Sequence, residues 1–324
     1  MILVTGGAGY IGSHYVQYAL EQGEQVVVLD NLVFGHREAV PEGVELITGD
    51  MGDTDLMNKI FTEHNIDAVV HFAAYAYVGE SVTDPCKYYN NNTVATLNVL
   101  DAMRRQKVNR FVFSSTCATF GNPVRVPMDE EHPQSPINPY GQSKYFVEQI
   151  LRAYHHAYGF QFVSLRYFNA AGADPKGRIG ESHDPETHLI PLIMQTAQGK
   201  RQHIGIFGTD YDTPDGTCIR DYIHILDLAQ AHDLALKRLR SGGESAFYNL
   251  GTEQGYSVRE VVSVCEKVCG RKIAVQELPR RAGDPPRLVA SASRAKKELG
   301  WQPRFENLEE IAQTAWNWET SRRY

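Results

Sequence analysis

Short apolar runs alternate with longer segments of helical periodicity through the first half of the chain. The runs are rich in Val, Ile, Leu and Phe and are too short for helices, so each predicts a buried strand. They cover residues 2–4, 25–29, 44–47, 68–72, 110–113 and 161–166. Strands that are apolar on both faces and separated by helices form parallel sheets. The pattern therefore predicts an α/β fold with a doubly wound parallel sheet covered by helices on both faces.

The second half of the chain has a looser pattern. Residues 170–191 are rich in Gly, Pro and His, which is typical of a loop that borders a site. Because 324 residues exceed the usual size of one domain, we predict two: residues 1–169, and a smaller C-terminal α/β domain of residues 170–324, some segments of which return to the first. Apolar helical stripes, which we expect to form the core of this second lobe, cover residues 227–239, 257–269, 293–299 and 307–318.

The first apolar run breaks into three glycines spaced three apart. Gly6 permits a tight turn, Gly9 lets backbone approach a pyrophosphate, and Gly12 lets helix and strand pack closely. Such a triplet also occurs at ordinary strand–turn–helix corners. The next strand, however, follows at βαβ distance and ends in Asp30, whose carboxylate can accept hydrogen bonds from both ribose hydroxyls and repels a 2′-phosphate. Together these features predict a Rossmann domain that binds NAD rather than NADP.

Two other polar residues lie near the ends of predicted strands. Asp50 contacts the adenine of the dinucleotide, or it caps the helix predicted over residues 55–64; the sequence favours neither reading. His71 lies within an apolar run, and we interpret it as a core histidine rather than a ligand.

Hydroxyl groups end the fifth predicted strand, at Ser114, Ser115 and Thr116. A helix that begins at Pro139 then places Tyr140 and Lys144 one turn apart on one face. A free tyrosine is a poor base at neutral pH because its pKa is about 10, but an adjacent ammonium favours the phenolate. We therefore expect Tyr140 to act as a general base near neutrality.

Several stretches together carry a resemblance to a known family. They are residues 5–12, Asp30, Ser115-Thr116 and Tyr140-x-x-x-Lys144, supported by residues 29–32, 71–74, 78–82, 166–169 and 220–224. Through them the chain resembles the extended short-chain dehydrogenase/reductase superfamily, and more narrowly its UDP-glucose 4-epimerase family, from about the first residue to the last helices.

The resemblance implies an NAD-dependent isomerase of galactose metabolism. Such an enzyme inverts carbon 4 of a UDP-hexose reversibly, through a transient 4-keto sugar, while NAD stays bound. In this scheme Tyr140 takes the proton of the 4-hydroxyl and Thr116 hydrogen-bonds that oxygen. Lys144 lowers the pKa of the tyrosine and binds the nicotinamide ribose.

The resemblance also implies two sets of binding residues. Arg220, Arg280 and Arg281 are candidates for a diphosphate clamp, because guanidinium groups grip phosphate oxygens in pairs, and the family pattern selects Arg220 and Arg281. The residues expected at the cofactor are Gly6, Gly9, Tyr10, Ile11, Gly12, Asp30, Asn31, Asp50, Met51, Phe72, Ala73, Ala74, Asn91, Ser114, Tyr140, Lys144 and Tyr167. Those expected at the UDP-sugar are Thr116, Tyr140, Asn169, Leu189, Phe207, Arg220, Tyr222, Arg281 and Asp284.

The chain departs from the family pattern at three positions. Thr116 replaces a serine found in many relatives and keeps the hydroxyl, whereas Ala76 replaces a lysine found in some and removes one cofactor contact. Leu288 is intermediate in size at the position that tunes the pocket for N-acetylated sugars. UDP-glucose and UDP-galactose are therefore favoured, with UDP-N-acetylhexosamine or UDP-pentose as the alternative.

Two other functions fit the residues less well. A nucleotide-sugar 4,6-dehydratase needs an acid and a base directly after the strand-end threonine, where this chain has Cys117 and Ala118. A silent NAD-binding module would tolerate loss of Tyr140 or Lys144, and both are present.

Composition and net charge limit the partners and the cellular compartment that we expect for this protein. A net charge of −7 argues against a nucleic-acid partner, and no apolar run is long enough to span a bilayer. The five cysteines lack CxxC spacing and no basic leader precedes the first strand, so we expect reduced thiols and a cytoplasmic protein. No thiolate or carboxylate accompanies His183 and His188 at metal-ligand spacing, so no metal is expected. The family pattern implies a homodimer through helices near residues 92–104 and 143–156.

Overall fold

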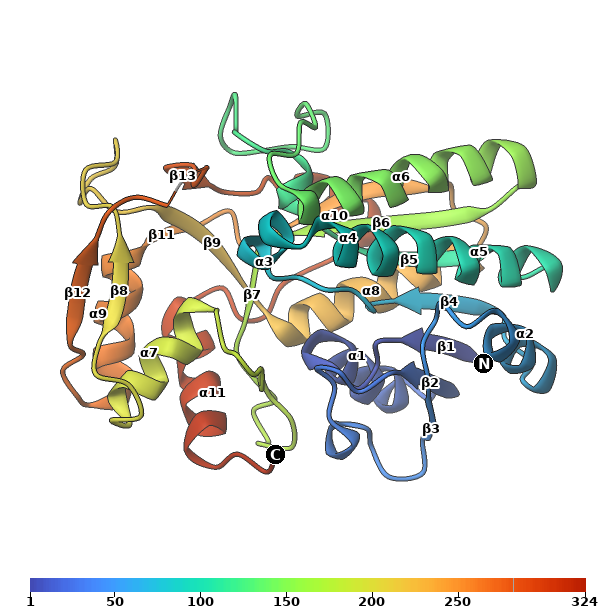
Figure 1. The fold of residues 1–324 in the computed structure, drawn as a ribbon, viewed down its shortest axis with the longest axis horizontal. Coiled ribbons are helices and arrows are strands. Elements are labelled where there is room, and N and C mark those ends of the chain that lie inside the picture. Colours follow the sequence, from blue (N-terminus) through green and yellow to red (C-terminus); the bar gives the residue numbers. More distant parts are fainter. Residues whose placement is uncertain (282) are drawn as a thin grey trace.

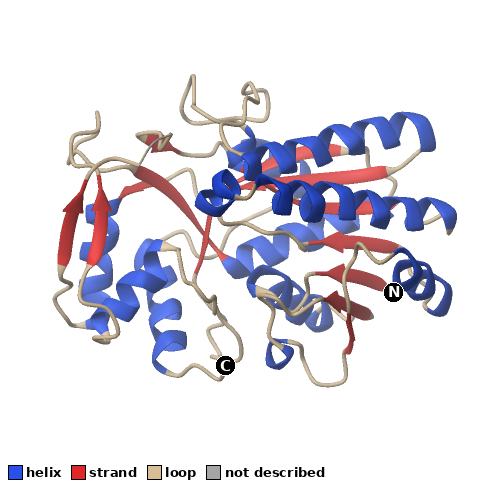
Figure 2. Cartoon of the chain, viewed as in Figure 1, coloured by secondary structure: helices blue, strands red, loops and turns tan. Residues whose placement is uncertain are grey.

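The computed structural model describes residues 1–281 and 283–324. Its largest element is a parallel sheet of seven strands in the order β10-β6-β5-β4-β1-β2-β3 (Figures 1 and 2). All six runs predicted from the sequence are strands of this sheet, so the predicted fold class is confirmed. The strands are β1 (Ile2–Thr5), β2 (Val26–Asp30), β3 (Glu45–Thr48), β4 (Ala68–His71), β5 (Arg110–Thr116), β6 (Gln161–Tyr167) and β10 (Ala246–Leu250).

Helices cover both faces of the large sheet and bury two apolar layers. One layer lies under α1 (Tyr10–Glu21), α8 (Ile225–Arg240) and α10 (Ser293–Leu299). The other lies under α2 (Thr54–Glu63), α5 (Ala95–Arg105) and α6 (Pro139–Tyr158). Shorter helical segments are η1 (Arg37–Ala39), α3 (Val78–Thr83), α4 (Pro85–Tyr88), η2 (Tyr89–Val94) and η3 (Cys117–Thr119).

The expectation that all four late helices form the second lobe's core is wrong for two of them. The apolar stripes of α8 and α10 pack on the large sheet, beside β10, and so complete its first layer. Periodicity shows that a helix has an apolar face, but it does not show which sheet that face covers.

The second lobe is built from short strands and three helices. In it α7 (Leu189–Ala197), α9 (Val258–Cys269) and α11 (Leu308–Thr320) share one apolar core. Its strands are β7 (Asn169–Ala171), β8 (Ile204–Phe207), β9 (Ile219–His224), β11 (Gly255–Ser257), β12 (Val275–Leu278) and β13 (Arg287–Leu288). β9 pairs with β7, β11 and β13, and β8 pairs with β12. Among the described residues, no helix is both long and apolar enough to cross a membrane.

Candidate active site

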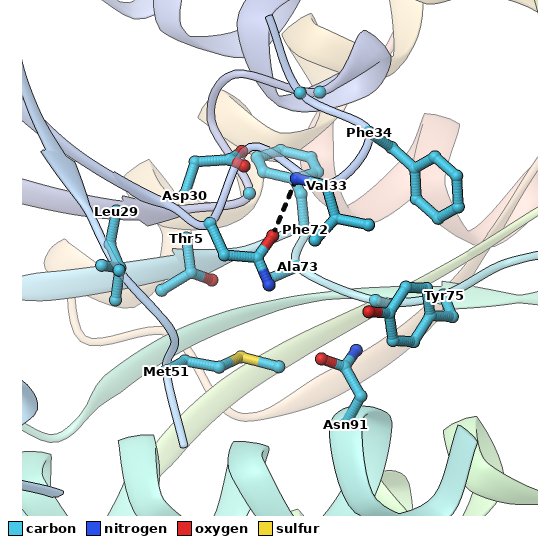
Figure 3. Close-up of a pocket in the computed structure, with 16 residues that line it drawn as sticks. Thr5, Leu29, Asp30, Val33, Phe34, Met51, Phe72, Ala73, Tyr75 and Asn91 are labelled. Carbon is cyan, nitrogen blue, oxygen red and sulfur yellow. Dashed lines mark hydrogen bonds between the residues drawn. The ribbon is translucent and has the colours of Figure 1, made fainter. Parts of the chain in front are cut away.

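A pocket opens at the carboxyl edge of the large sheet, where the strand order reverses between β1 and β4 (Figure 3). Ligands of doubly wound sheets bind at such switch points. Of the residues predicted at the cofactor, nine line it: Gly6, Gly9, Asp30, Asn31, Met51, Phe72, Ala73, Ala74 and Asn91. Residues at this pocket that the sequence analysis did not select are Thr5, Leu29, Val33, Phe34, Gly35, Gly49 and Tyr75.

The three glycines of the fingerprint differ in how much space a side chain would find at each of them. Gly6 has a φ of +73°, and a Cβ there would lie 2.5 Å from the backbone nitrogen of Ala73. A Cβ at Gly12 would overlap the carbonyl oxygen of Gly6, so helix–strand packing requires this glycine. At Gly9 the nearest atom would be 3.4 Å away, which is ordinary contact. The protein itself therefore does not fill the space at Gly9, which suits backbone that faces a pyrophosphate.

Asp30 ends β2 with its carboxylate at the pocket (Figure 3). It accepts hydrogen bonds from the backbone nitrogens of Ala8 at 2.9 Å and Leu32 at 2.8 Å. Burial raises the pKa of this carboxyl, and these backbone donors act in the opposite direction. A Cβ at Gly35 would lie 2.8 Å from Oδ1 of Asp30, so the missed Gly35 allows the next loop to close over the carboxylate.

Asp50 is not a helix cap. The cap of α2 is Asp53, whose Oδ1 accepts hydrogen bonds of 3.0 Å from the backbone nitrogens of Asp55 and Leu56. Asp50 instead accepts hydrogen bonds from the backbone of Gly52 at 2.7 Å and from Nδ2 of Asn31 at 3.1 Å. It lies next to the pocket-lining Asn31, and its contact with the adenine stays a prediction.

Several of the residues predicted at the cofactor lie outside this pocket. The hydroxyl of Tyr10 donates to the carbonyl of Gly172 at 2.6 Å, so its side chain turns toward the second lobe.

His71 is a core residue, as the sequence analysis predicted. Its ring nitrogens lie 2.7 Å and 3.0 Å from the hydroxyls of Thr5 and Thr96. Burial lowers the pKa of His71 to about 3, which keeps the ring neutral.

A turn of π-helix, η2, connects the pocket to α6. Its Asn92 accepts a hydrogen bond from the backbone nitrogen of Tyr75 and donates to the Tyr75 carbonyl, both at 2.9 Å, and it also donates to Oγ of Ser143 at 3.0 Å. π-Helical turns are frequent at functional sites. This one holds the pocket-lining Asn91 and Tyr75 in register with the helix that carries Tyr140 and Lys144.

Tyr140 and Thr116 come together at the start of α6. Asn138 caps the helix through a 2.8 Å hydrogen bond from the Gly141 backbone. A Cβ at Gly141 would overlap the carbonyl of Ala118, so this glycine lets the helix approach the end of β5. Burial raises the pKa of Tyr140 to about 12, and a hydrogen bond with the Thr116 hydroxyl acts in the opposite direction.

Lys144 lies beside Tyr140 along the helix but pairs with the end of β5. Its ammonium donates to the Ser114 carbonyl at 2.9 Å and lies 4.9 Å from the centre of the Phe113 ring. Burial lowers its pKa to about 7, against the attraction of Glu148. The Oγ of Ser114 in turn shares a short hydrogen bond with the hydroxyl of Tyr167. Ser114, Lys144 and Tyr167, which were predicted at the cofactor, therefore form one cluster at this edge.

The expectation that Lys144 brings the pKa of Tyr140 near neutrality is wrong for this structure. Desolvation acts on both groups and favours their neutral forms. It raises the pKa of the tyrosine and lowers that of the lysine.

Behind this cluster lies a buried ion pair that the sequence analysis missed. Glu148 follows Lys144 by one turn of α6 and accepts from Arg166 through Nε at 2.9 Å and Nη2 at 2.8 Å. Ser115, the neighbour of Thr116, donates to the same carboxylate at 2.6 Å. The i, i+4 spacing of 140, 144 and 148 was the available signal.

The predicted sugar-nucleotide residues of the second lobe form separate pairs. Arg220 makes an ion pair with Asp284, and the guanidinium of Arg281 lies 3.8 Å from the centre of the Phe207 ring. Arg280, the candidate that the family pattern did not select, binds Asp210 at 2.7 Å on the exposed surface.

Three further predicted residues lie close to the junction of the lobes. Asn169 pairs with Tyr222 in the β7–β9 ladder, and Leu189 begins α7. Tyr222 is only 4 % exposed and belongs to the core shared with Leu189, so its ring packs inward.

The expectation that no carboxylate accompanies His183 and His188 at metal-ligand spacing is wrong. Glu181 and Glu186 come from the same loop, and a donor atom from each of the four residues lies within 4.8 Å of the others. Residues 181–188 form a loop without helix or strand, so no regular periodicity indicated the cluster, and the loop's path brings the four side chains together.

Comparisons with known proteins agree with this geometry. A model of the NAD dependent epimerase/dehydratase family matches residues 2–251. The UDP-glucose 4-epimerase of Halalkalibacterium halodurans is 54 % identical over 317 residues, which are 98 % of this chain and 95 % of that protein.

Two solved structures are similarly close. The crystal structure of UDP-glucose 4-epimerase from Brucella ovis in complex with NAD superimposes with a TM-score of 0.95 at 48 % identity and covers 97 % of each chain. That of UDP-glucose 4-epimerase from Bifidobacterium longum in complex with NAD+ and UDP gives a TM-score of 0.94 at 40 % identity, over 99 % of this chain and 98 % of that one.

Proposed function

The chain belongs to the NAD dependent epimerase/dehydratase family, among its UDP-glucose 4-epimerases, and from this premise we propose which residues carry the reaction. The reaction is reversible epimerisation at carbon 4 of a UDP-hexose, with NAD as the cofactor. The observation that carries the assignment of roles is the close approach of the start of α6, which carries Tyr140, to the end of β5, which carries Thr116, at the edge of the sheet that also forms the dinucleotide pocket.

The residues at the switch point fit NAD. The open space at Gly9 suits the pyrophosphate, and the carboxylate of Asp30 suits the ribose hydroxyls of the adenosine. Lys144, whose ammonium donates to the Ser114 carbonyl, would bind the second ribose. NAD, when bound, supplies a reversible acceptor for the hydride of carbon 4.

Tyr140 moves the proton of the reaction. Its side-chain oxygen takes the proton of the sugar's 4-hydroxyl as that carbon is oxidised to the ketone, and returns it when the carbon is reduced on the opposite face. Thr116 hydrogen-bonds the 4-oxygen throughout. The positive end of the α6 dipole favours the phenolate form of Tyr140, because this residue lies in the first turn of the helix.

Inversion requires a firm grip on UDP and a loose grip on the hexose. Arg220 and Arg281 hold the diphosphate, and Asn169, Leu189, Phe207 and Asp284 form the rest of the nucleotide-sugar side. Tyr222, whose ring packs in the core, supports them from behind. Residues 1–169, together with α8, β10 and α10, serve as the NAD-binding domain. The other residues serve as the nucleotide-sugar domain. Leu288 pairs with Arg220 in the ladder of β9 and β13, and its size favours UDP-glucose and UDP-galactose over N-acetylated sugars.

One experiment tests the roles as a whole. The purified protein is incubated with UDP-galactose and no added NAD, and we expect UDP-glucose to form because the cofactor is retained and the reaction is redox-neutral. Release of a 4-keto-6-deoxy sugar would instead identify a dehydratase. A requirement for stoichiometric NAD, with NADH as a product, would identify a dehydrogenase.

The working form that we propose is a cytoplasmic homodimer. Val94, Phe146 and Tyr158 are exposed by 56 %, 42 % and 55 %, on the adjoining helical segments η2 and α6. Large apolar side chains exposed on neighbouring helices support a protein–protein interface there. All five cysteines are free, which suits a reducing compartment.

A further inference from the structure

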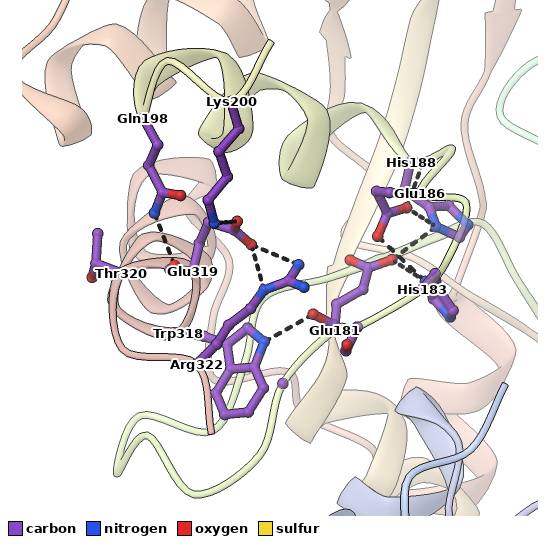
Figure 4. Close-up of polar contacts among 12 residues, drawn as sticks. Glu181, His183, Glu186, His188, Gln198, Lys200, Trp318, Glu319, Thr320 and Arg322 are labelled. Atoms are coloured by element: carbon purple, nitrogen blue, oxygen red, sulfur yellow. Dashed lines mark hydrogen bonds and ion pairs between the residues drawn. The ribbon is translucent and has the colours of Figure 1, made fainter. Parts of the chain in front are cut away.

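Four side chains of metal-ligating type converge in the loop before α7, outside the lining of the dinucleotide pocket. Glu181, His183, Glu186 and His188 point toward one another in Figure 4. The proposed epimerisation uses none of them. Their donor set is two imidazoles and two carboxylates.

Each imidazole lies close to both carboxylates, and Glu186 meets the two imidazoles with different oxygens. Nδ1 of His188 lies 2.8 Å from Oε1 of Glu181 and 3.1 Å from Oε1 of Glu186. Nδ1 of His183 lies 3.3 Å from Oε1 of Glu181 and 3.4 Å from Oε2 of Glu186. A zinc ion with bonds of about 2.0–2.1 Å holds its tetrahedral ligands roughly 3.3–3.4 Å apart.

The donor atoms lack other partners. Oε1 of Glu181, Nδ1 of His183 and Oε2 of Glu186 are buried and make no hydrogen bond within the described chain. Glu181 is 5 % exposed, and its Oε1 is directed at both imidazoles. These buried atoms therefore face only the other members of the cluster, which is the arrangement of ligands around one cation.

One carboxylate is already oriented by the backbone. Oε1 of Glu186 accepts hydrogen bonds from the backbone nitrogens of Thr187 at 2.7 Å and His188 at 2.8 Å. These bonds fix the carboxylate so that its second oxygen faces His183. Oriented ligands of this kind are typical of metal sites, in which outer hydrogen bonds hold the inner donors.

The charge of the cluster favours a cation. The two histidines lower the pKa of both glutamates, and the carboxylates raise the pKa of His183 to about 9 and that of His188 to about 10. A field that attracts two protons also attracts one doubly charged ion.

We propose that Glu181, His183, Glu186 and His188 bind one divalent transition-metal ion, zinc foremost. Mixed imidazole and carboxylate donors suit zinc, and four protein ligands make a closed site of the structural rather than the catalytic kind. The side chain of His188 is 43 % exposed, which gives the ion a path of entry from solvent.

The position of the cluster defines what the ion does. The indole of Trp318 in α11 donates to the carbonyl of Glu181 at 2.8 Å, and the hydroxyl of Tyr77 donates to the carbonyl of Pro185 at 2.8 Å. The loop thus touches both lobes, and the ring of Tyr10 from the glycine fingerprint lies 6.1 Å from that of His183. The ion fixes this loop where the two lobes meet.

The test measures metal directly, on full-length protein without a histidine tag. Protein produced with added zinc and then dialysed is expected to carry about one zinc per chain by mass spectrometry of the digested sample. Chelator treatment followed by Co²⁺ is expected to give the strong visible absorption of tetrahedral cobalt. Reloading with zinc is expected to raise Tm by several degrees relative to the stripped protein.

Matched variants locate the site. The double variant His183→Gln/His188→Gln is expected to lower zinc affinity by more than about 100-fold, since loss of an outer partner alone costs 10- to 100-fold. His203→Gln, at an exposed histidine elsewhere in the second lobe, is expected to keep the affinity of the parent. If the double variant does not fold, the zinc content and the cobalt spectrum of the stripped and reloaded parent protein decide whether the site exists.

Three results would overturn the proposal. They are a chain that binds no zinc or cobalt, zinc retained at full affinity by the double variant, and cobalt spectra of octahedral coordination only. Because epimerase turnover is assayed without added metal, these results leave the proposed function untouched.

Discussion

Tyr140 and Lys144 show at the scale of single residues how burial sets the chemistry of the site. Their pKa values, about 12 and about 7, are displaced in opposite directions by the same loss of solvent. A positive charge brought into this cleft lowers the pKa of both, because it stabilises the phenolate and repels the ammonium. A larger fraction of Tyr140 is therefore in the phenolate form, which can accept a proton, when a cation lies close to it.

Replacing Tyr140 by Phe is expected to lower turnover by about 10²- to 10⁴-fold, since a positioned proton-transfer group contributes that much. Binding of UDP is expected to stay within about twofold, because the phenol is not part of the nucleotide grip. Steady-state kinetics and titration with UDP measure the two effects. Tyr158→Phe, at an exposed tyrosine of the same helix, is the control; near-full activity of Tyr140→Phe would reject the proposed base.

Asp30→Asn is expected to weaken NAD binding by roughly 10- to 100-fold, since a hydrogen bond to a charged group is worth about 1.5–3 kcal/mol. Discrimination against NADP is expected to fall at the same time, because the carboxylate no longer repels a 2′-phosphate. Equilibrium titration of cofactor-stripped protein with each dinucleotide checks this. Asp50→Asn is the comparison at the neighbouring strand end, and equal losses for both variants would contradict a special role for Asp30.

At the scale of elements, α6 carries three polar side chains in one row along its surface. Tyr140, Lys144 and Glu148 follow one another at a spacing of four residues, and the first faces Thr116 while the last pairs with Arg166. The helix is held at its start by the Asn138 cap and at its end by Gly159, whose φ is +71°. Small displacements of α6 thus move both proposed catalytic side chains together.

The Glu148–Arg166 pair is expected to be costly to break from one side. Glu148→Gln leaves a buried guanidinium without its carboxylate, and the expected loss is about 3–5 kcal/mol in the free energy of unfolding. The double variant Glu148→Gln/Arg166→Met is expected to recover much of this loss, because no unpaired charge remains. Urea denaturation measures both. A single variant as stable as the parent would show that the pair contributes nothing.

Two helical segments also carry the expected dimer contact. Phe146→Glu puts a charge into the proposed apolar interface of α6, and we expect it to convert the dimer to a monomer. Light scattering coupled to size-exclusion chromatography measures the mass. Val124→Glu, at an exposed valine of the loop between β5 and α6, is expected to leave the dimer intact. A monomeric parent protein would refute the interface.

At the scale of the whole molecule, four buried histidines tie stability to pH. Burial lowers the pKa of His71 and His224 to about 3 and that of His14 and His232 to about 4. In the unfolded chain each titrates near 6.5. The unfolded state therefore binds more protons below pH 6.5, so stability is full above that pH and falls as the pH drops toward 4.

The free energy of unfolding is expected to fall by several kcal/mol between pH 7 and pH 5. Each of the four histidines contributes up to about 2 kcal/mol over this interval, since one pKa unit corresponds to about 1.4 kcal/mol. Urea denaturation at fixed temperature and a series of pH values gives the curve. Stability that is flat or rises on acidification would contradict neutral histidines in the core.

The sequence by itself determined the features that depend on neighbours along the chain. Apolar runs of strand length predicted six strands of the sheet, the glycine spacing and Asp30 predicted the dinucleotide pocket, and a spacing of four predicted a shared face for Tyr140 and Lys144. These signals are local, because periodicity and turn geometry act over a few residues.

Only the tertiary structure decided features that depend on distant segments. It sent α8 and α10 to the large sheet and turned Tyr10 away from the pocket. It removed enough solvent from the half-buried Tyr140 and the buried Lys144 to raise the pKa of the tyrosine and lower that of the lysine, and it gathered Glu181 and Glu186 around two histidines. Desolvation and the convergence of side chains depend on every surrounding atom, and those atoms come from parts of the chain that no local pattern relates.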